Sequence, residues 1–213
     1  MFLLSRRIKS MGIKMVLSGE GADEILGGYL YFHNAPDRES FQNETERRVK
    51  LLHQYDVLRS DRATAAHGLE VRVPFLDKEF INYILSLDSK YKVNYDENGT
   101  RIEKYILRKS FEGNYLPDDI LWRQKDAFSD AVGYNWVTSI KEHANNEISD
   151  EEFANRDEIY PHNTPDTKEA FYYRKIFEEY YPGRANLISE IWRPLWSDTN
   201  EPSATQLNIH KKM

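Results

Sequence analysis

Residues 18–24 combine glycines with acidic side chains, a mixture suited to contact with phosphate through a metal ion. The stretch reads Ser-Gly-Glu-Gly-Ala-Asp-Glu. Its glycines allow the backbone to approach a ligand closely or adopt positive φ, whereas its carboxylates would repel a bare phosphate. A divalent cation removes that conflict, because Mg²⁺ prefers a few carboxylate oxygens together with substrate phosphates. The loop therefore predicts a metal–nucleotide contact. The alternative is that Asp23 and Glu24 only favour the start of the next helix through its dipole.

The elements before this loop predict half of an α/β unit. Ile13–Leu17 is a short apolar run between turn residues, typical of a fully buried parallel strand. Residues 1–11 place Leu4, Ile8 and Met11 on one face of a helix. Ligands of open parallel sheets gather beyond the carboxyl ends of strands, and the acidic loop occupies that place.

The chain beyond the loop is predicted to be mostly helical. A helix over Glu44–Arg62 would put Val49, Leu52, Asp56 and Arg59 on one stripe. A charge on an inward stripe needs a partner or a ligand. Asp56 is thus a candidate site residue, and a simple i,i+3 pair with Arg59 is the alternative.

Other features predict structure more than chemistry. Glu70 and Arg72 are expected to form an ion pair, and Asp77 and Asp166 to begin helices. The remaining expected elements are a polar turn at 96–100, a helix near 102–111, a short helix from Pro117 to Trp122, and a packing stripe of Ala170, Tyr173, Phe177 and Tyr180.

Lys125 lies in a basic-then-acidic loop at 123–130 that has an aromatic residue in its middle. A lysine is a mobile point charge suited to phosphate. The alternative is a solvated surface lysine, as most lysines are.

Composition narrows the class of protein. The 213 residues carry a net charge of −6, which argues against a general nucleic-acid or membrane-surface role. No apolar run approaches the roughly 20 residues of a membrane span, and nothing resembles a cleavable signal, so a cytoplasmic location is expected. The chain has no cysteine, and its scattered histidines form no zinc motif. Its 14 tyrosines suit interfaces.

Several longer motifs, in order along the chain, resemble those of the glutamine-dependent asparagine synthetases. They are Val16–Glu24 followed by Gly27–His33, Tyr55–Arg59, His67–Asp77, Glu103–Arg108, Trp122–Asp130 and Asn163–Pro165. The resemblance implies the later part of the synthetase domain: one or a few strands of a parallel, PP-loop ATPase-like adenine-nucleotide-binding sheet, followed by a mostly α-helical region. The expected division is 1–30 for the end of the nucleotide-binding α/β part, 31–196 for the helical part and 197–213 for a tail.

The resemblance also implies the reaction, its residues and, since members of the family pair, a homodimer. The side-chain carboxylate of aspartate attacks ATP to give β-aspartyl-AMP, and ammonia from glutamine then displaces AMP. The matching positions imply ATP contacts at Ser18, Gly19 and Gly21, a pocket-lining carboxylate at Asp56 with Arg59 as a supporting residue, a Mg²⁺–pyrophosphate ligand at Asp23, and catalytic roles for Glu20 and Lys125.

The chain departs from the family pattern in ways that leave alternatives open. It lacks the cysteine nucleophile of the glutaminase domain and the Ser-Gly-Gly-Leu-Asp-Ser pyrophosphate loop. We therefore expect a truncated segment that needs a glutaminase domain or a missing N-terminal part, and no aspartate-dependent exchange by the chain alone. The alternatives are a non-catalytic relic of that enzyme and a β-lactam synthetase-like amide ligase. The family match over Asn163–Trp196 weighs against the second.

Overall fold

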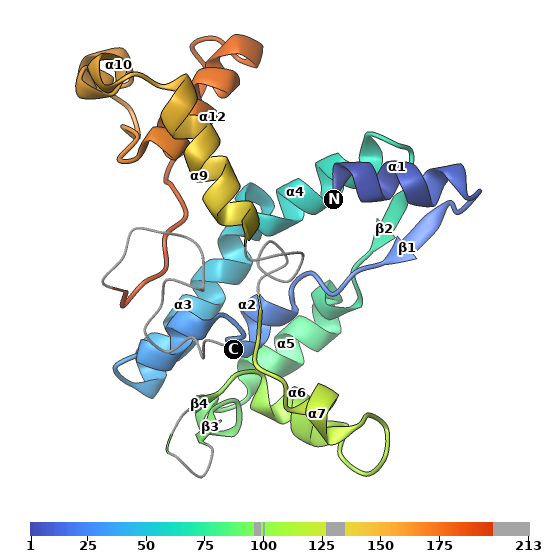
Figure 1. The fold of residues 1–213 in the computed structure, drawn as a ribbon. Helices are drawn as coiled ribbons and strands as arrows, with labels where there is room; N and C mark the ends of the chain where they lie inside the picture. Colours follow the sequence, from blue (N-terminus) through green and yellow to red (C-terminus); the bar gives the residue numbers. More distant parts are fainter. Residues whose placement is uncertain (96–98, 100, 127–134, 198–213) are drawn as a thin grey trace. The chain divides into compact units, whose positions relative to one another are not determined.

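The structure is a computed structural model that describes residues 1–95, 99, 101–126 and 135–197 (Figure 1). The chain divides into two compact units. The first spans Met1–Lys125 and takes up the chain again at Pro194, whereas the second begins at Asp126 and ends its main segment at Arg193.

The first unit is mixed α/β and mostly helical, as the sequence predicts, while the wider PP-loop sheet stays a prediction. Its described α-helices are α1 (Phe2–Ser10), α2 (Ala22–Leu26), α3 (Arg38–Leu51), α4 (Asp56–Ala65), α5 (Lys78–Ser86), α6 (Tyr105–Ser110) and α7 (Asp118–Leu121). Short 3₁₀ helices connect them: η1 (Leu30–Asn34), η2 (Leu52–Gln54), η3 (Pro74–Leu76) and η4 (Ser89–Tyr91). The strands are β1 (Met15–Leu17), β2 (Glu70–Arg72), β3 (Asn94–Tyr95) and β4 (Arg101–Ile102).

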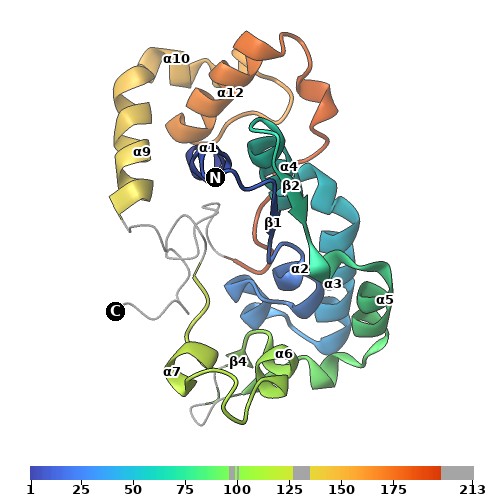
Figure 2. The same cartoon turned by 90° about the vertical axis from the view of Figure 1, so that its right-hand side faces the viewer.

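β1 and β2 form a parallel pair in which Val16 lies opposite Val71. The prediction that the first strand is fully buried is wrong: Leu17 is 69% exposed and Met15 39%. A parallel strand is buried on both faces only where helices cover both. Among the described residues β2 alone pairs with β1, and α1 packs against α4 beside the sheet (Figures 1 and 2).

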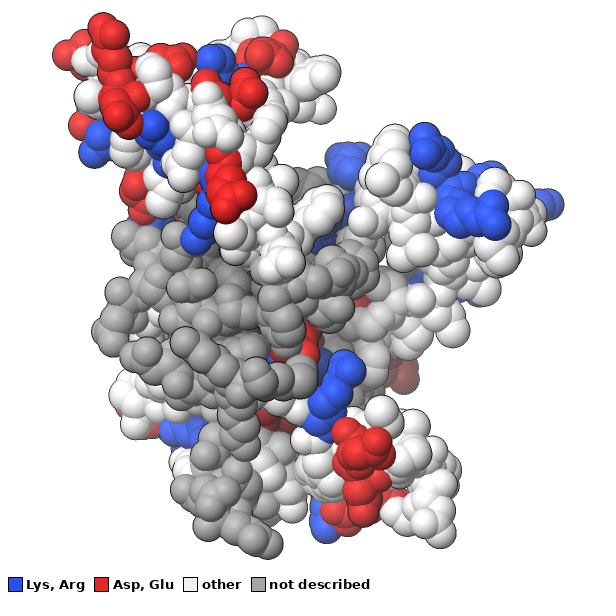
Figure 3. Space-filling view, in the orientation of Figure 1, with Lys and Arg blue, Asp and Glu red and all other residues white. Residues whose placement is uncertain are grey.

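α1 forms where expected but does not bury the predicted apolar face. Leu4 and Met11 are exposed, and Ser5 is the buried residue of the helix. The ring of Phe2 packs on His67 with centroids 4.3 Å apart. Basic side chains gather over this helix (Figure 3), and one of them, Lys9, donates from Nζ to the Gly68 carbonyl at 2.7 Å.

The core of the first unit lies where α2 meets α3 and α5. Ile25 and Leu26 are buried there against Ile84. Gly27 ends α2 with φ +61, and a Cβ at this position would lie 2.2 Å from the ring of Phe41. Glycine is therefore required both by the backbone and by the close approach of α3.

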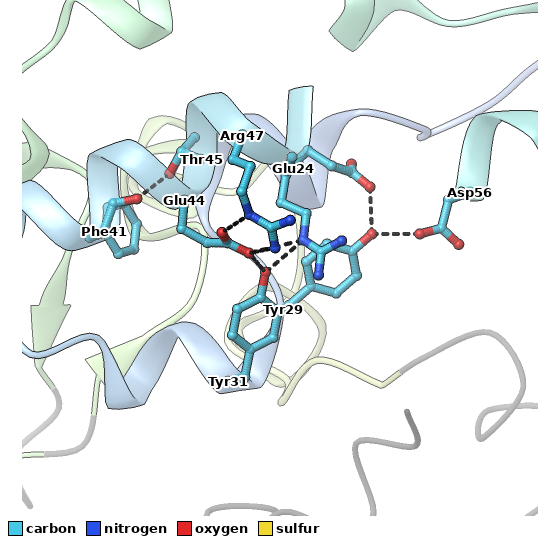
Figure 4. A network of polar contacts seen from close by, with 9 residues as sticks. Glu24, Tyr29, Tyr31, Phe41, Glu44, Thr45, Arg47 and Asp56 are labelled. Atoms are coloured by element: carbon cyan, nitrogen blue, oxygen red, sulfur yellow. Dashed lines mark hydrogen bonds and ion pairs between the residues drawn. The ribbon is translucent and has the colours of Figure 1, made fainter. Parts of the chain in front are cut away.

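The predicted single helix over 44–62 is wrong, because the chain breaks between α3 and α4. Tyr55 adopts φ −121 and ψ −118, outside the helical region, so the apolar stripe does not run on from α3 to Asp56. At the break, the guanidinium of Arg48 lies 5.4 Å from the ring of Tyr55. The same guanidinium donates from Nε to Tyr31 Oη at 2.9 Å and to Glu44 Oε1 at 3.0 Å (Figure 4).

The structure confirms some of the predicted local features and corrects others. The Glu70–Arg72 ion pair is confirmed at 2.7 Å, although both side chains are exposed. Asp77 caps α5 by accepting from two backbone N–H groups. The helix expected near 102–111 begins only at Tyr105, since β4 pairs antiparallel with β3 before it. Pro117 is the N-cap of α7. The expected polar turn at 96–100 and the end of the 123–130 loop lie largely outside the described residues.

The second unit is helical in its described part. Its helices are α9 (Asn135–Glu147), α10 (Asp150–Ala154), α11 (Arg156–Ile159) and α12 (Lys168–Tyr180), followed by η5 (Ala185–Leu187). Thr167 rather than Asp166 caps α12, because the Thr167 side chain accepts from Ala170 N at 3.1 Å, whereas Asp166 pairs with Arg193 at 2.7 Å. No described helix of either unit is long and apolar enough to cross a membrane.

The aromatic stripe predicted on α12 is not the buried face of that helix. Phe171 is buried, whereas Tyr173 and Tyr180 are exposed. Phe171 packs instead against Phe153 and Tyr160, with centroids 6.3 and 5.1 Å apart. Ala170, Tyr173 and Phe177 line part of a mostly apolar cavity of about 360 Å³.

Candidate active site

The Ser18–Glu24 loop is held by its own polar groups and by β2. Ser18 N donates to Arg72 O at 2.9 Å, which continues the parallel pairing by one residue. Glu20 N donates to Ser18 Oγ at 3.4 Å, and Ala22 N donates to Gly19 O at 3.2 Å. The loop thus turns directly from β1 into α2 and brings its carboxylates to the carboxyl end of the strand.

The glycines of the loop are under different constraints. Gly21 has φ +91, and a Cβ there would lie 2.2 Å from Leu76 Cδ2, so packing and backbone conformation require glycine without any ligand. At Gly19 an added Cβ would meet nothing within 4 Å. The structure gives Gly19 no internal reason to be glycine, and its contact with ATP stays a prediction.

Asp23 lies between two lysines that come from distant parts of the chain. Its Oδ1 is 2.7 Å from Lys104 Nζ, and its Oδ2 is 3.4 Å from Lys125 Nζ. Gly28 makes this approach possible, because a Cβ there would lie 2.2 Å from Asp23 Oδ1 and 2.5 Å from Lys104 Cε. The structure therefore brings together the predicted Asp23 and Lys125 and adds a second ammonium.

Glu20 and Asp56 are linked through Arg59. Arg59 Nη2 lies 2.9 Å from Asp56 Oδ1 and 3.9 Å from Glu20 Oε1. The simple Asp56–Arg59 pair is thus present, and it also faces the predicted catalytic carboxylate. Burial raises the pKa of Glu20, the Arg59 charge opposes this, and the nearby carboxylates Asp56 and Asp23 raise it further, so the net shift is upward. A raised pKa makes a carboxylate a better proton acceptor.

Tyr29 joins Glu24 to Asp56 (Figure 4). Its hydroxyl lies in hydrogen-bond contact with Glu24 Oε1, and it is 2.8 Å from Asp56 Oδ2. A phenol has one proton, so two such bonds need a second proton from one of the carboxyl groups. Burial raises the pKa of Glu24 to about 7, which makes Glu24 the natural holder of that proton.

The donor set at Asp23 suits a magnesium ion only in company with phosphate. Asp23 Oδ1 is buried, and its charge partner among the described residues is the Lys104 ammonium at 2.7 Å. No group of three or more possible metal-ligating side chains occurs in the described part of the chain. One carboxylate flanked by ammonium groups is a poor cage for a free cation, yet it fits a cation that brings its own phosphate oxygens.

Sequence reasoning left three contributors to this cluster without a role. Lys104 and Glu103 stand in a motif that resembles the family, and Tyr29 follows a pair of glycines, but no local pattern shows where their side chains lie. The sequence did offer one signal for them: Glu103 and Lys104 are adjacent charged residues in a motif to which no function had been assigned. Among the predicted site residues, Ser18, Glu20, Asp23, Asp56 and Lys125 all belong to the first unit.

The whole chain is similar in sequence to one family of known proteins. A profile of the asparagine synthase family matches residues 1–44 and 34–208. A probable asparagine synthetase (glutamine-hydrolyzing) of Dictyostelium discoideum is 54% identical over 217 residues, covering 99% of this chain and 39% of that protein. Asparagine synthetase (glutamine-hydrolyzing) 1 of Arabidopsis thaliana is 51% identical over 228 residues, with the same coverage. The protein of that name from Triphysaria versicolor is 57% identical over 220 residues, covering 95% of this chain and 37% of its own.

The chain thus spans about two fifths of the length of these curated relatives. The match runs through the acidic loop and the segments that carry Asp56, Lys104 and Lys125. The chain belongs to the asparagine synthase family.

Proposed function

We propose that this chain forms part of the synthetase site of a glutamine-dependent asparagine synthetase. The reaction converts aspartate to asparagine with ATP, through β-aspartyl-AMP, and uses ammonia that a glutaminase domain releases from glutamine. The observation that carries the proposal is the Asp23 carboxylate between the Lys104 and Lys125 ammonium groups, beside Glu20. The names of the relatives support the same reaction.

The first chemical step needs positive charge around a leaving pyrophosphate. The aspartate carboxylate attacks the α-phosphorus of ATP, the bond from that phosphorus to the bridging oxygen breaks, and the electron pair leaves with pyrophosphate. Lys104 and Lys125 supply ammonium groups at the place where this charge would accumulate. Mg²⁺ held by Asp23 and phosphate oxygens would neutralise further charge when bound.

The second step needs a proton acceptor. Ammonia attacks the carbonyl carbon of β-aspartyl-AMP, AMP leaves with the electron pair of the broken bond, and the nitrogen must lose a proton to give the amide. Glu20 is suited to this task because its pKa is raised by burial and by the neighbouring carboxylates. Arg59 bridges Glu20 and Asp56 and would keep both carboxylates oriented.

A binding measurement on the chain tests the phosphate part of the proposal. Calorimetric titration with pyrophosphate in excess Mg²⁺ should show saturable binding. Replacing either lysine, in Lys104→Ala or Lys125→Ala, should raise Kd about tenfold, because each removes one charge-assisted contact. The matched control is Lys78→Ala, an exposed lysine at the start of α5, which should leave Kd unchanged. Equal Kd values for all variants would contradict the assignment.

A chimera tests the complete reaction. The matching segment of the Arabidopsis relative is replaced by these 213 residues, and asparagine formation is measured with glutamine and with ammonia. Activity close to that of the parent is expected. Glu20→Gln in the chimera should lower the rate at least about a hundredfold, since it removes the proton acceptor. Asparagine formation at an undiminished rate by this variant would show that Glu20 has another role.

A further inference from the structure

Glu103 and Lys104 are neighbours in the chain and reach different parts of the candidate site. Lys104 Nζ lies 2.7 Å from Asp23 Oδ1, whereas Glu103 Oε1 accepts from the backbone N–H of Lys125 at 2.6 Å. Lys104 has φ 54 and ψ 33, a left-handed conformation that is uncommon outside glycine. Such a residue persists only where its surroundings fix it, and it occurs often at functional sites.

Arg108 fixes Glu103 from the other side. Its Nε donates to Glu103 O at 2.8 Å, and its Nη2 donates to Glu103 Oε1 at 3.0 Å. Its Nη1 donates to Leu121 O at 2.5 Å, at the end of α7 and just before the segment that leads to Lys125. A guanidinium presents its donors in a rigid fork, so this geometry ties the start of α6 to the end of α7.

The Glu103 carboxylate is buried and is nevertheless held in its ionised form. Glu103 is 8% exposed, and its Oε2 lies 3.6 Å from His33 Nε2, too far for a hydrogen bond. Burial alone would raise the pKa of Glu103, but contact with His33, the Arg108 charge and the Lys125 amide outweigh it, so the net shift is downward. An ionised carboxylate makes a stronger bond to a backbone N–H than a neutral acceptor does.

We propose that Glu103, held by Arg108, is a positioning residue that fixes the backbone at Lys125 so that the Lys125 ammonium faces Asp23 beside Lys104. Neither Glu103 nor Arg108 has a task in the reaction as derived above. Both act through Lys125. This role explains physically why the Glu103–Arg108 motif contains a glutamate and an arginine at these positions. The identity of the ligand, the pyrophosphate end of a nucleotide, rests on the proposed function.

The first test measures how strongly the Lys125 backbone N–H is protected, without any ligand. Amide hydrogen exchange at Lys125 is followed by ¹H–¹⁵N NMR in the full 213-residue chain. Glu103→Ala should accelerate exchange about tenfold to a hundredfold, because it removes a charged acceptor. Glu103→Gln keeps an oxygen at the same place, so exchange should rise less than about fivefold. Arg108→Lys should lie between these variants, because lysine cannot reproduce the fork.

Controls separate positioning from loss of fold. Glu79→Ala removes an exposed glutamate of α5 and should leave exchange at Lys125 unchanged. Far-UV circular dichroism and the exchange of buried core amides at Ile25 and Leu26 check that each variant is folded. Unchanged exchange at Lys125 in folded Glu103→Ala would overturn the inference. If Glu103→Ala does not fold, the exchange rate at Lys125 is measured in Arg108→Lys and Glu103→Gln instead. Wild-type exchange rates in both of these variants would overturn the inference.

The second test connects position to ligand. Kd for pyrophosphate with excess Mg²⁺ should rise about tenfold in Glu103→Ala and less than about threefold in Glu103→Gln. Faster exchange in Glu103→Ala with unchanged Kd would overturn the positioning role. If the wild-type chain binds no pyrophosphate, the phosphate part of the proposed function fails instead, and the exchange data alone decide whether Glu103 fixes Lys125.

Discussion

Replacing Glu44 by glutamine should destabilise the first unit strongly. Glu44 and Arg48 have side chains only 1% exposed and lie 3.0 Å apart, and Glu44 Oε1 also accepts from Tyr31 Oη at 2.6 Å (Figure 4). Glutamine keeps the volume and an acceptor oxygen but removes the charge, which leaves Arg48 uncompensated in the interior. Breaking a buried pair in this way costs about 3–5 kcal/mol. That is a large part of the roughly 5–15 kcal/mol that stabilises a typical domain.

The matched control lies on the same helix. Glu46 pairs with Lys50 at 3.7 Å in the same i,i+4 spacing, but the two side chains are 40% and 75% exposed. Glu46→Gln should therefore cost about 0–1 kcal/mol, because water screens an exposed pair. The comparison holds helix, spacing and substitution constant. The two sites differ in burial, in the partner cation, and in the further contacts that buried Glu44 makes with Tyr31 and Arg47.

The assay is urea unfolding followed by far-UV circular dichroism. The free energy of unfolding is obtained by linear extrapolation, with a check that the slope m is the same for all variants. A double variant, Glu44→Gln with Arg48→Met, should recover stability relative to Glu44→Gln, because it removes the buried charge that was left alone. If Glu44→Gln and Glu46→Gln agree within about 0.5 kcal/mol, a value typical of neutral surface changes, the argument from burial is refuted.

The other predictions concern the loop glycines and a buried lysine. Gly21→Ala should lower the free energy of unfolding by at least about 1–2 kcal/mol, from the left-handed backbone alone, with the clash on Leu76 adding to it. Gly19→Ala should have the same free energy of unfolding as the wild type. A rise in its Kd for ATP, measured by calorimetry, would then show that ATP approaches the Gly19 backbone closely, whereas an unaltered Kd would contradict that contact. Burial lowers the pKa of Lys92 to about 8 from 10.5. Because the unfolded chain binds more protons between these values, stability should rise with pH across that window. Lys92→Met should abolish the rise in urea unfolding curves, and an unchanged pH profile would count against a buried Lys92.

Local structure could be predicted where one short segment determines it. The cap at Asp77, the helical content and the turn from strand into acidic loop follow from turn chemistry and periodicity, which act over a few residues. The break at Tyr55 could not be foreseen, because the stacking of Arg48 on its ring joins α3 to the start of α4. The prediction that Asp166 caps α12 is wrong for a similar reason, since that side chain pairs with Arg193 instead.

For the candidate site, the sequence by itself determined the kinds of group present: an acidic, glycine-containing loop after a strand, and charged motifs elsewhere that resemble one family. Only the tertiary structure decided that Asp23 meets both Lys104 and Lys125, that Tyr29 joins Glu24 to Asp56, and that Glu103 holds the Lys125 backbone. The physical reason is that residue types and spacings act locally. The distances that set charge pairing and pKa arise between segments far apart in the chain, which packing alone brings together.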